Sequence, residues 1–83
     1  MQQSHYELGI TITPNPVKNV VYISGKGMQH ISIMDNTGKI VIHKTLDNTD
    51  NTNINIANLA KGVYYISVND NLGKVESGKL VVE

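Results

Sequence analysis

The chain has 83 residues, no Cys, and seven basic residues balanced by seven acidic ones. This composition excludes disulfides and thiolate metal sites, and it leaves no basic surface of the kind that nucleic acids or anionic membranes bind. A domain of this size has a small core, which argues against a buried active site. No apolar stretch reaches the roughly 20 residues of a membrane-spanning helix, so we expect no direct membrane insertion.

The first strand is predicted at Tyr6–Thr13, where apolar residues alternate with others. Ile, Val and Thr are abundant and suit strands, whereas the equally abundant Asn suits turns. The segment Pro14, Asn15 and Pro16 ends this strand, because proline cannot donate to a sheet and Asn15 is held extended before Pro16.

Six further short runs of β-branched and aromatic residues predict six more strands. They are Asn19–Ser24, His30–Asp35, Ile40–Leu46, Asn53–Ile56, Val63–Asn69 and Val75–Val82. A glycine cluster at residues 25–27 and a polar stretch at residues 47–52 are expected to be the loops between strands. In the tight turn before Ile40, Gly38 is expected to take a positive φ angle, which costs glycine nothing.

Seven short strands separated by turns predict an all-β fold, a seven-stranded antiparallel immunoglobulin-like β-sandwich. No segment keeps a helical apolar period for three turns, so no substantial helix is expected. The alternation also predicts which side chains face the core. They are Ile31, Ile33, Ile54, Ile56, Tyr64, Ile66, Val68, Leu80 and Val82.

Few residues are candidates for chemistry. His30 and His43 could share a metal across the predicted hairpin, but they have no acidic partner at ligand spacing, so surface histidines are the better interpretation. Asp47 and Asp50 lack the acid spacing of a calcium loop. The serines have no neighbouring base and no nucleophile elbow. We therefore expect no enzymatic activity, no metal and no cofactor.

Two features bear on binding, although one or two exposed tyrosines and a buried last strand are ordinary in such a domain. Tyr64 and Tyr65 are adjacent, so one points into the core and the other outward, and an outward Tyr65 together with Tyr22 would suit a carbohydrate-binding face. The last strand carries Leu80 and Val82 on one face and Val75 and Val81 on the other. Such a strand is either buried on both sides or awaits a partner, because exposed strand edges are docking templates.

Four segments in order resemble one known family. They are Pro14–Pro16, Ile31–Val41, Ile54–Val68 and Gly78–Val82. Together they resemble the type A C-terminal sorting domain of the type IX secretion system (the Por secretion system), although family members often end in basic residues and this chain ends in Glu83. The residues that carry the resemblance are Pro14, Asn15, Pro16, Asp35, Gly38, Lys39, Leu59, Gly62, Tyr64, Lys79, Leu80, Val81 and Val82.

The resemblance implies a targeting module at the end of an exported protein. Residues 1–10 would then be the end of the linker from the upstream cargo and the start of the first strand, and residues 11–83 the sorting domain. Expected partners are the type IX outer-membrane translocon and a sortase-like protease that removes the domain. The cargo would pass through the periplasm to the cell surface or the medium, and the domain itself would be a monomer.

Two alternatives stay open at this point. One is a carbohydrate-binding or adhesion module of similar architecture, and the other is an accessory domain of a secreted enzyme.

Overall fold

The computed structural model describes residues 9–83, which form only strands, turns and bends. The strands are β1 (Thr11–Thr13), β2 (Val20–Met34), β3 (Ile40–Asn55), β4 (Gly62–Asp70) and β5 (Val75–Val82). All named strands pair antiparallel in the order β1-β2-β4-β5, and β3 also pairs with β2. The all-β prediction is confirmed for this part of the chain. Residues 6–8 of the predicted first strand lie outside the described residues.

No segment within residues 9–83 is a helix of the length and hydropathy needed to cross a membrane.

The described residues contain five strands rather than the seven that were predicted, because two predicted loops are bends within continuous strands. The glycine cluster at residues 25–27 lies inside β2, and the polar residues 47–52 lie inside β3. The two strands stay paired through the bend, with register shifts between Ser24 and Met28 and between Met28 and His30. The expected sandwich of seven separate strands is therefore replaced by one strongly curled sheet.

Polar side chains make the bend possible. Gly27 and Asn48 both adopt positive φ angles, of 62° and 53°, which glycine and asparagine tolerate best. The Gly27 N–H donates to the Asp50 carboxylate at 3.0 Å, and the Asn48 N–H donates to the Gln29 side-chain oxygen at 2.9 Å. These side chains provide hydrogen-bond partners for backbone groups at the bulge. The glycine-rich and polar composition that predicted two loops therefore belongs here to a bulge within paired strands.

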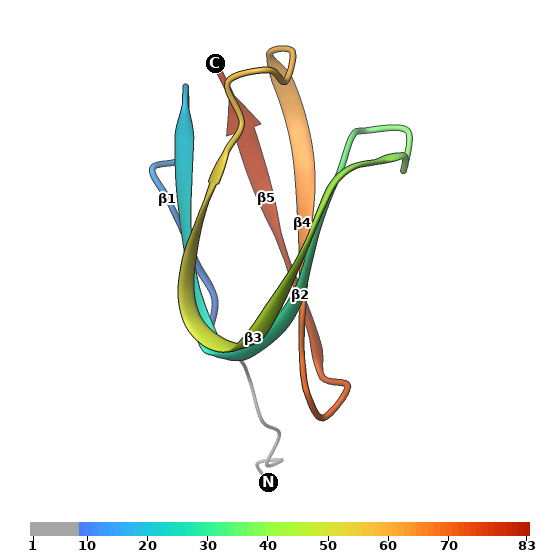
Figure 1. The fold of residues 1–83 in the computed structure, drawn as a ribbon. Coiled ribbons are helices and arrows are strands. Elements are labelled where there is room, and N and C mark those ends of the chain that lie inside the picture. The colour runs from blue at the N-terminus through green and yellow to red at the C-terminus, as the bar shows by residue number, and fades with distance from the viewer. Residues whose placement is uncertain (1–8) are drawn as a thin grey trace, which may run out of the picture.

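Because of the bend, β2 pairs with β1 along its first half and with β4 along its second half. Tyr22 lies opposite Thr13 in the first half, for example, and Ile31 lies opposite Val68 in the second. Figure 1 shows β2 and β3 curving together, so that the two halves of each strand face one another across the interior. The Lys44 ammonium group bridges the halves of β3 by donating to the Thr52 hydroxyl and the Asn53 carbonyl, each at 3.0 Å.

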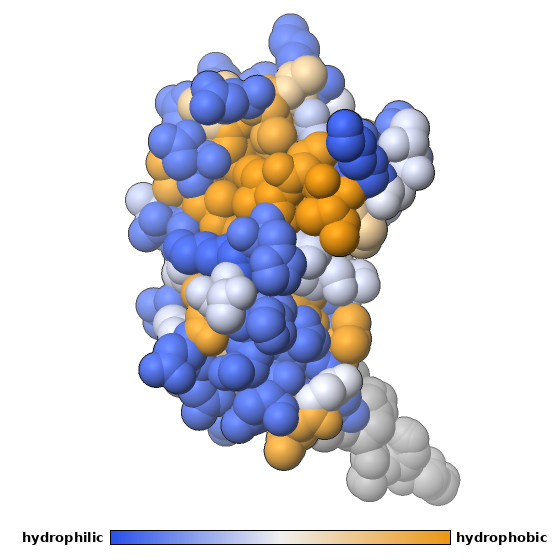
Figure 2. Space-filling view, turned by 45° about the vertical axis from the view of Figure 1, so that its right-hand side comes forward, coloured by the Kyte–Doolittle hydropathy of each residue, from blue (hydrophilic) through white to orange (hydrophobic). Residues whose placement is uncertain are grey.

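The core lies inside this curl. Every side chain that the alternation placed in the core is buried there, and Val17, Val21, Ile23 and Met28 join them. Burying apolar area of this kind is the main stabilising contribution in so small a domain. On the face that Figure 2 shows, apolar residues gather in the upper half, and the lower half is mostly polar.

A tyrosine holds the corner that leads from β3 into β4. The Tyr64 hydroxyl donates to the Ala60 carbonyl at 2.6 Å, while its ring is buried in the core. Leu59 packs partly against the same core, and its N–H donates to the Ile56 carbonyl at 3.0 Å. Gly62 has a φ angle of 150°, which side-chain-bearing residues rarely adopt. Leu59, Gly62 and Tyr64, three residues of the family motif, therefore build this corner.

The tyrosine corner can be tested with the adjacent tyrosine as a matched control. Tyr64→Phe keeps the buried ring but removes the hydroxyl that bonds Ala60, so we expect a loss of about 1 kcal/mol in the free energy of unfolding. Tyr65→Phe changes an exposed side chain and is expected to have no measurable effect. Urea denaturation followed by circular dichroism compares the two, and equal midpoints would contradict the assignment.

Candidate functional site

The first and last motifs of the sequence meet in the folded chain. We use the name terminal clamp for Asn15 and Val17 together with the segment Lys79–Glu83, to which they are hydrogen-bonded. The Pro14–Pro16 segment therefore does more than end the first strand, because it lies against the end of the chain. The sequence indicated both motifs separately but not their contact.

Asn15 is the centre of the terminal clamp. Its side-chain amide donates to the Lys79 carbonyl at 2.8 Å, and its side-chain oxygen accepts from the Val81 N–H at 2.9 Å. A carboxamide has the same donor and acceptor as a peptide group. Asn15 thus pairs with the edge of β5 as one peptide unit of a neighbouring strand would.

Val17 continues this pairing along β5. Its N–H donates to the Val81 carbonyl at 2.8 Å, and its carbonyl accepts from the Glu83 N–H at 2.9 Å, which makes a parallel bridge opposite Val82. The Val17 side chain is buried in the core. The peptide bonds before Pro14 and Pro16, on either side of Asn15, are both cis.

The end of β5 is consequently enclosed on three sides. The β4 strand pairs along one edge, with Gly62 opposite Val82 and Tyr64 opposite Leu80. Asn15 and Val17 occupy the other edge, and the Leu80 and Val82 side chains are buried, with 0% and 4% of their surface exposed. The predicted burial of Leu80 and Val82 is confirmed, and only the outward face of the strand is left for a partner.

The motif residues Asp35, Gly38 and Lys39 form a separate site, the turn between β2 and β3. The Asp35 carboxylate accepts from the Thr37 hydroxyl at 2.6 Å, the Thr37 N–H at 2.9 Å and the Lys39 N–H at 3.0 Å. Gly38 has a φ angle of 88°, which confirms the predicted positive value. These three hydrogen bonds lower the pKa of the Asp35 carboxyl, with the Thr37 hydroxyl as the largest cause and the Lys39 N–H next.

The same turn recurs between β4 and β5. Asp70 accepts from the Leu72 N–H at 3.0 Å and the Lys74 N–H at 2.8 Å, and Gly73 has a φ angle of 86°. Both turns share the sequence Asp-Asn-x-Gly-Lys, at residues 35–39 and 70–74. Our reading of the sequence missed this repeat, which a direct comparison of the two turns would have found. It indicates that Asp35, Gly38 and Lys39 shape a turn.

The other candidate groups do not converge. The rings of His30 and His43 lie 5.6 Å apart between centroids and are tilted by 30°, so the two histidines are neighbours across the hairpin. Within residues 9–83, no three His, Asp or Glu side chains are grouped closely enough to hold a metal ion. Tyr22 and Tyr65 are both exposed, but they pair with different strands on different halves of the sheet.

The fold and the terminal clamp define a small all-β module whose last strand is locked to a motif near its start. A family model described as the secretion system C-terminal sorting domain matches residues 11–83. The chain belongs to this family, the C-terminal sorting domains of the type IX secretion system. No curated protein matches the chain at the significance required.

One solved structure has a similar fold, that of CopC from Methylosinus trichosporium OB3b. It superimposes with a TM-score of 0.51 at 23% sequence identity, over 89% of this chain and 93% of that chain. At this identity the likeness concerns the fold alone.

The terminal clamp can be tested by removing the Asn15 side chain. Asn15→Ala deletes two hydrogen bonds to β5, so we expect a loss of about 1–2 kcal/mol in the free energy of unfolding. We also expect faster hydrogen exchange at the Val81 amide, which loses its acceptor. Asn71→Ala, at an exposed turn position, is the matched control. Unchanged exchange at Val81 would contradict the clamp.

The Asp35 turn predicts a pH dependence of stability. The carboxyl pKa is lower in the folded chain than its value of about 3.9 in unfolded chains. The stabilisation is therefore full above the unfolded pKa and is lost as the pH falls through the folded pKa. We expect wild type to exceed Asp35→Asn in stability near neutral pH and the difference to shrink below about pH 3.9. Urea midpoints measured across this range test it, and a constant difference would contradict it.

Proposed function

We propose that this domain is the sorting signal of an exported protein and directs that protein through the type IX outer-membrane machinery. Membership of the family supports this proposal and implies a larger cargo polypeptide and an extracellular or cell-surface destination. The observation that carries the mechanism is the Asn15 carboxamide bonded to Lys79 and Val81. It fixes the terminal strand in one conformation, which gives a receptor a constant shape to bind.

The proposed route has three stages. An upstream signal peptide takes the parent protein into the periplasm, where the folded domain is recognised by the translocon. The cargo then crosses the outer membrane, and a sortase-like protease removes the domain. The domain is a monomer in this scheme and a substrate of the protease, and it performs no catalysis itself.

The carbohydrate-binding alternative is less well supported. It needs Tyr22 and Tyr65 to form one aromatic platform for a sugar ring. Tyr22 lies opposite Thr13 of β1 and Asn53 of β3, whereas Tyr65 lies opposite Met34 of β2 and Lys79 of β5. The two rings therefore stand on separate halves of the curled sheet.

The proposed function is tested by fusing residues 1–83 behind a periplasmic reporter. We expect the reporter to reach the cell surface or the medium in a host with type IX machinery and to stay in the periplasm of a host in which that machinery is inactivated. Deleting Lys79–Glu83 is expected to retain the reporter in the competent host. Periplasmic retention of the complete fusion in that host would contradict the proposal.

The deletion also removes Leu80 and Val82 from the core, so unfolding could imitate the loss of a signal. Val81→Lys is the milder variant, because the Val81 side chain lies on the face opposite these two residues. Reporter localisation is therefore measured together with the thermal melting of each purified domain.

A further inference from the structure

The terminal strand can be reached by a partner only through its outward side chains. Along Lys79–Glu83, one edge of the strand is hydrogen-bonded to β4 and the other to Asn15 and Val17, so no further strand can add there while the domain is folded. The inward side chains of Leu80 and Val82 are buried. Between residues 79 and 82, the groups that remain are the exposed Lys79 and the half-buried Val81.

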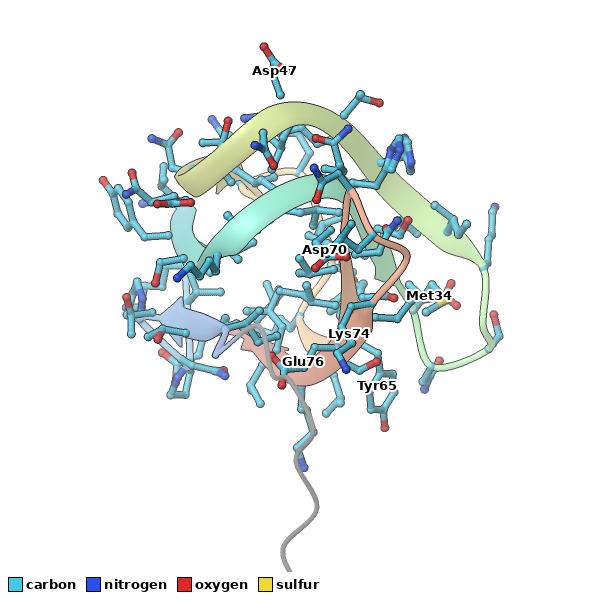
Figure 3. The ribbon with its side chains drawn as sticks, turned by 90° about the horizontal axis from the view of Figure 1, so that it is seen from below. Met34, Asp47, Tyr65, Asp70, Lys74 and Glu76 are labelled. Carbon is cyan, nitrogen blue, oxygen red and sulfur yellow. The ribbon has the colours of Figure 1, made fainter. Side chains whose placement is uncertain are left out.

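These two residues stand beside exposed apolar residues of β4. Tyr65 lies directly opposite Lys79, and Val63 lies directly opposite Val81. Tyr65 is 44% exposed and Val63 is 38% exposed, while Tyr64 between them is buried. In Figure 3 the Tyr65 side chain points away from the sheet. We use the name outer patch for Val63, Tyr65, Lys79 and Val81.

The outer patch is confined to the end of the sheet that holds the chain terminus. Two residues further along the same strands, on the same face, the opposed pair is Ser67 and Ser77. Small hydroxyl side chains there replace the aromatic and aliphatic groups. The next apolar group on this face of β5 is Val75, which is 60% exposed, so the Ser67 and Ser77 pair separates the outer patch from it.

Lys79 adds a positive charge to the outer patch, which a partner has to match. Its ammonium group is exposed and makes no ion pair within residues 9–83. A partner that covered Tyr65 and Val63 with apolar surface would also have to face this positive charge. A carboxylate at that place would satisfy it, and a lysine or arginine would be repelled. The patch thus fits a protein surface that is apolar with an acidic group at its centre.

We propose that the outer patch is the docking surface for the receptor of the type IX machinery, and that this receptor presents an apolar surface with a carboxylate opposite Lys79. This inference rests on the proposed sorting function. Its consequence is that the signal spans two strands, because Val63 and Tyr65 lie 16 and 14 residues before Lys79 in the chain. A receptor that read the last residues as a linear peptide would be insensitive to Tyr65.

The experiment uses the reporter fusion and two exposed tyrosines that differ in position. Tyr65→Ser removes the aromatic ring of the outer patch, and Tyr22→Ser makes the same change on the other half of the sheet, where the side chain is 55% exposed. We expect Tyr65→Ser to reduce export about tenfold, as loss of an aromatic anchor does at an interface, and Tyr22→Ser to leave it unchanged. Thermal melting of both purified domains is measured in parallel.

A charge reversal keeps the inference testable if Tyr65→Ser unfolds the domain. Lys79→Glu changes only an exposed group and is expected to reduce export, whereas Lys26→Glu makes the same change at an exposed position in the bend of β2 and is expected to have no effect. Export of Tyr65→Ser and Lys79→Glu at wild-type levels, with Lys79–Glu83 still required, would overturn the docking surface and leave the sorting function intact. Failure of the wild-type fusion to be exported would overturn both.

Discussion

The two hydrogen bonds of the Asn15 carboxamide to β5 are the constraint on which the terminal clamp depends. They tie the segment after β1 to the end of the chain, 66 residues away from Asn15 at Val81. A sheet with the order β1-β2-β4-β5 would otherwise leave the edge of β5 open to another chain. Because Val17 follows with two backbone hydrogen bonds, the curled sheet is closed at this side by its own N-terminal segment.

The side chains of the core were predictable from the sequence, but the number of strands was not. Alternation alone placed Ile31, Ile33 and Ile66 inside, because a strand has a period of two residues wherever it begins and ends. A loop and a bulge, in contrast, use the same residues. Gly27 and Asn48 have positive φ angles that suit either one. Only the opposite strand decides between them, since β2 and β3 bend at matching places and stay paired.

The candidate site was predicted in its parts and missed as a whole. Gly38, Tyr64 and Leu80 behave as the local patterns indicated, because turn geometry, burial and alternation act over a few neighbouring residues. Asn15 was interpreted as part of a strand stop, since flanking prolines remove backbone donors, and as a residue of the family motif, but not as a partner of the last strand. Its side-chain partners lie at the other end of the chain. Patterns among a few neighbouring residues cannot predict such a contact. The order of the motifs indicates only that both ends of the chain belong to the family pattern.

The repeated turn helps to separate structural motifs from recognition motifs. Asp35 and Asp70 accept the same backbone hydrogen bonds in turns that share the sequence Asp-Asn-x-Gly-Lys, so the conformation of the turn explains both. A receptor that used this turn would find it twice in every domain, at two different hairpins. The outer patch occurs once, beside the terminus, and combines Tyr65 with Lys79 across two strands. A receptor that binds the domain in a single orientation therefore needs a feature such as the outer patch, and not the repeated turn.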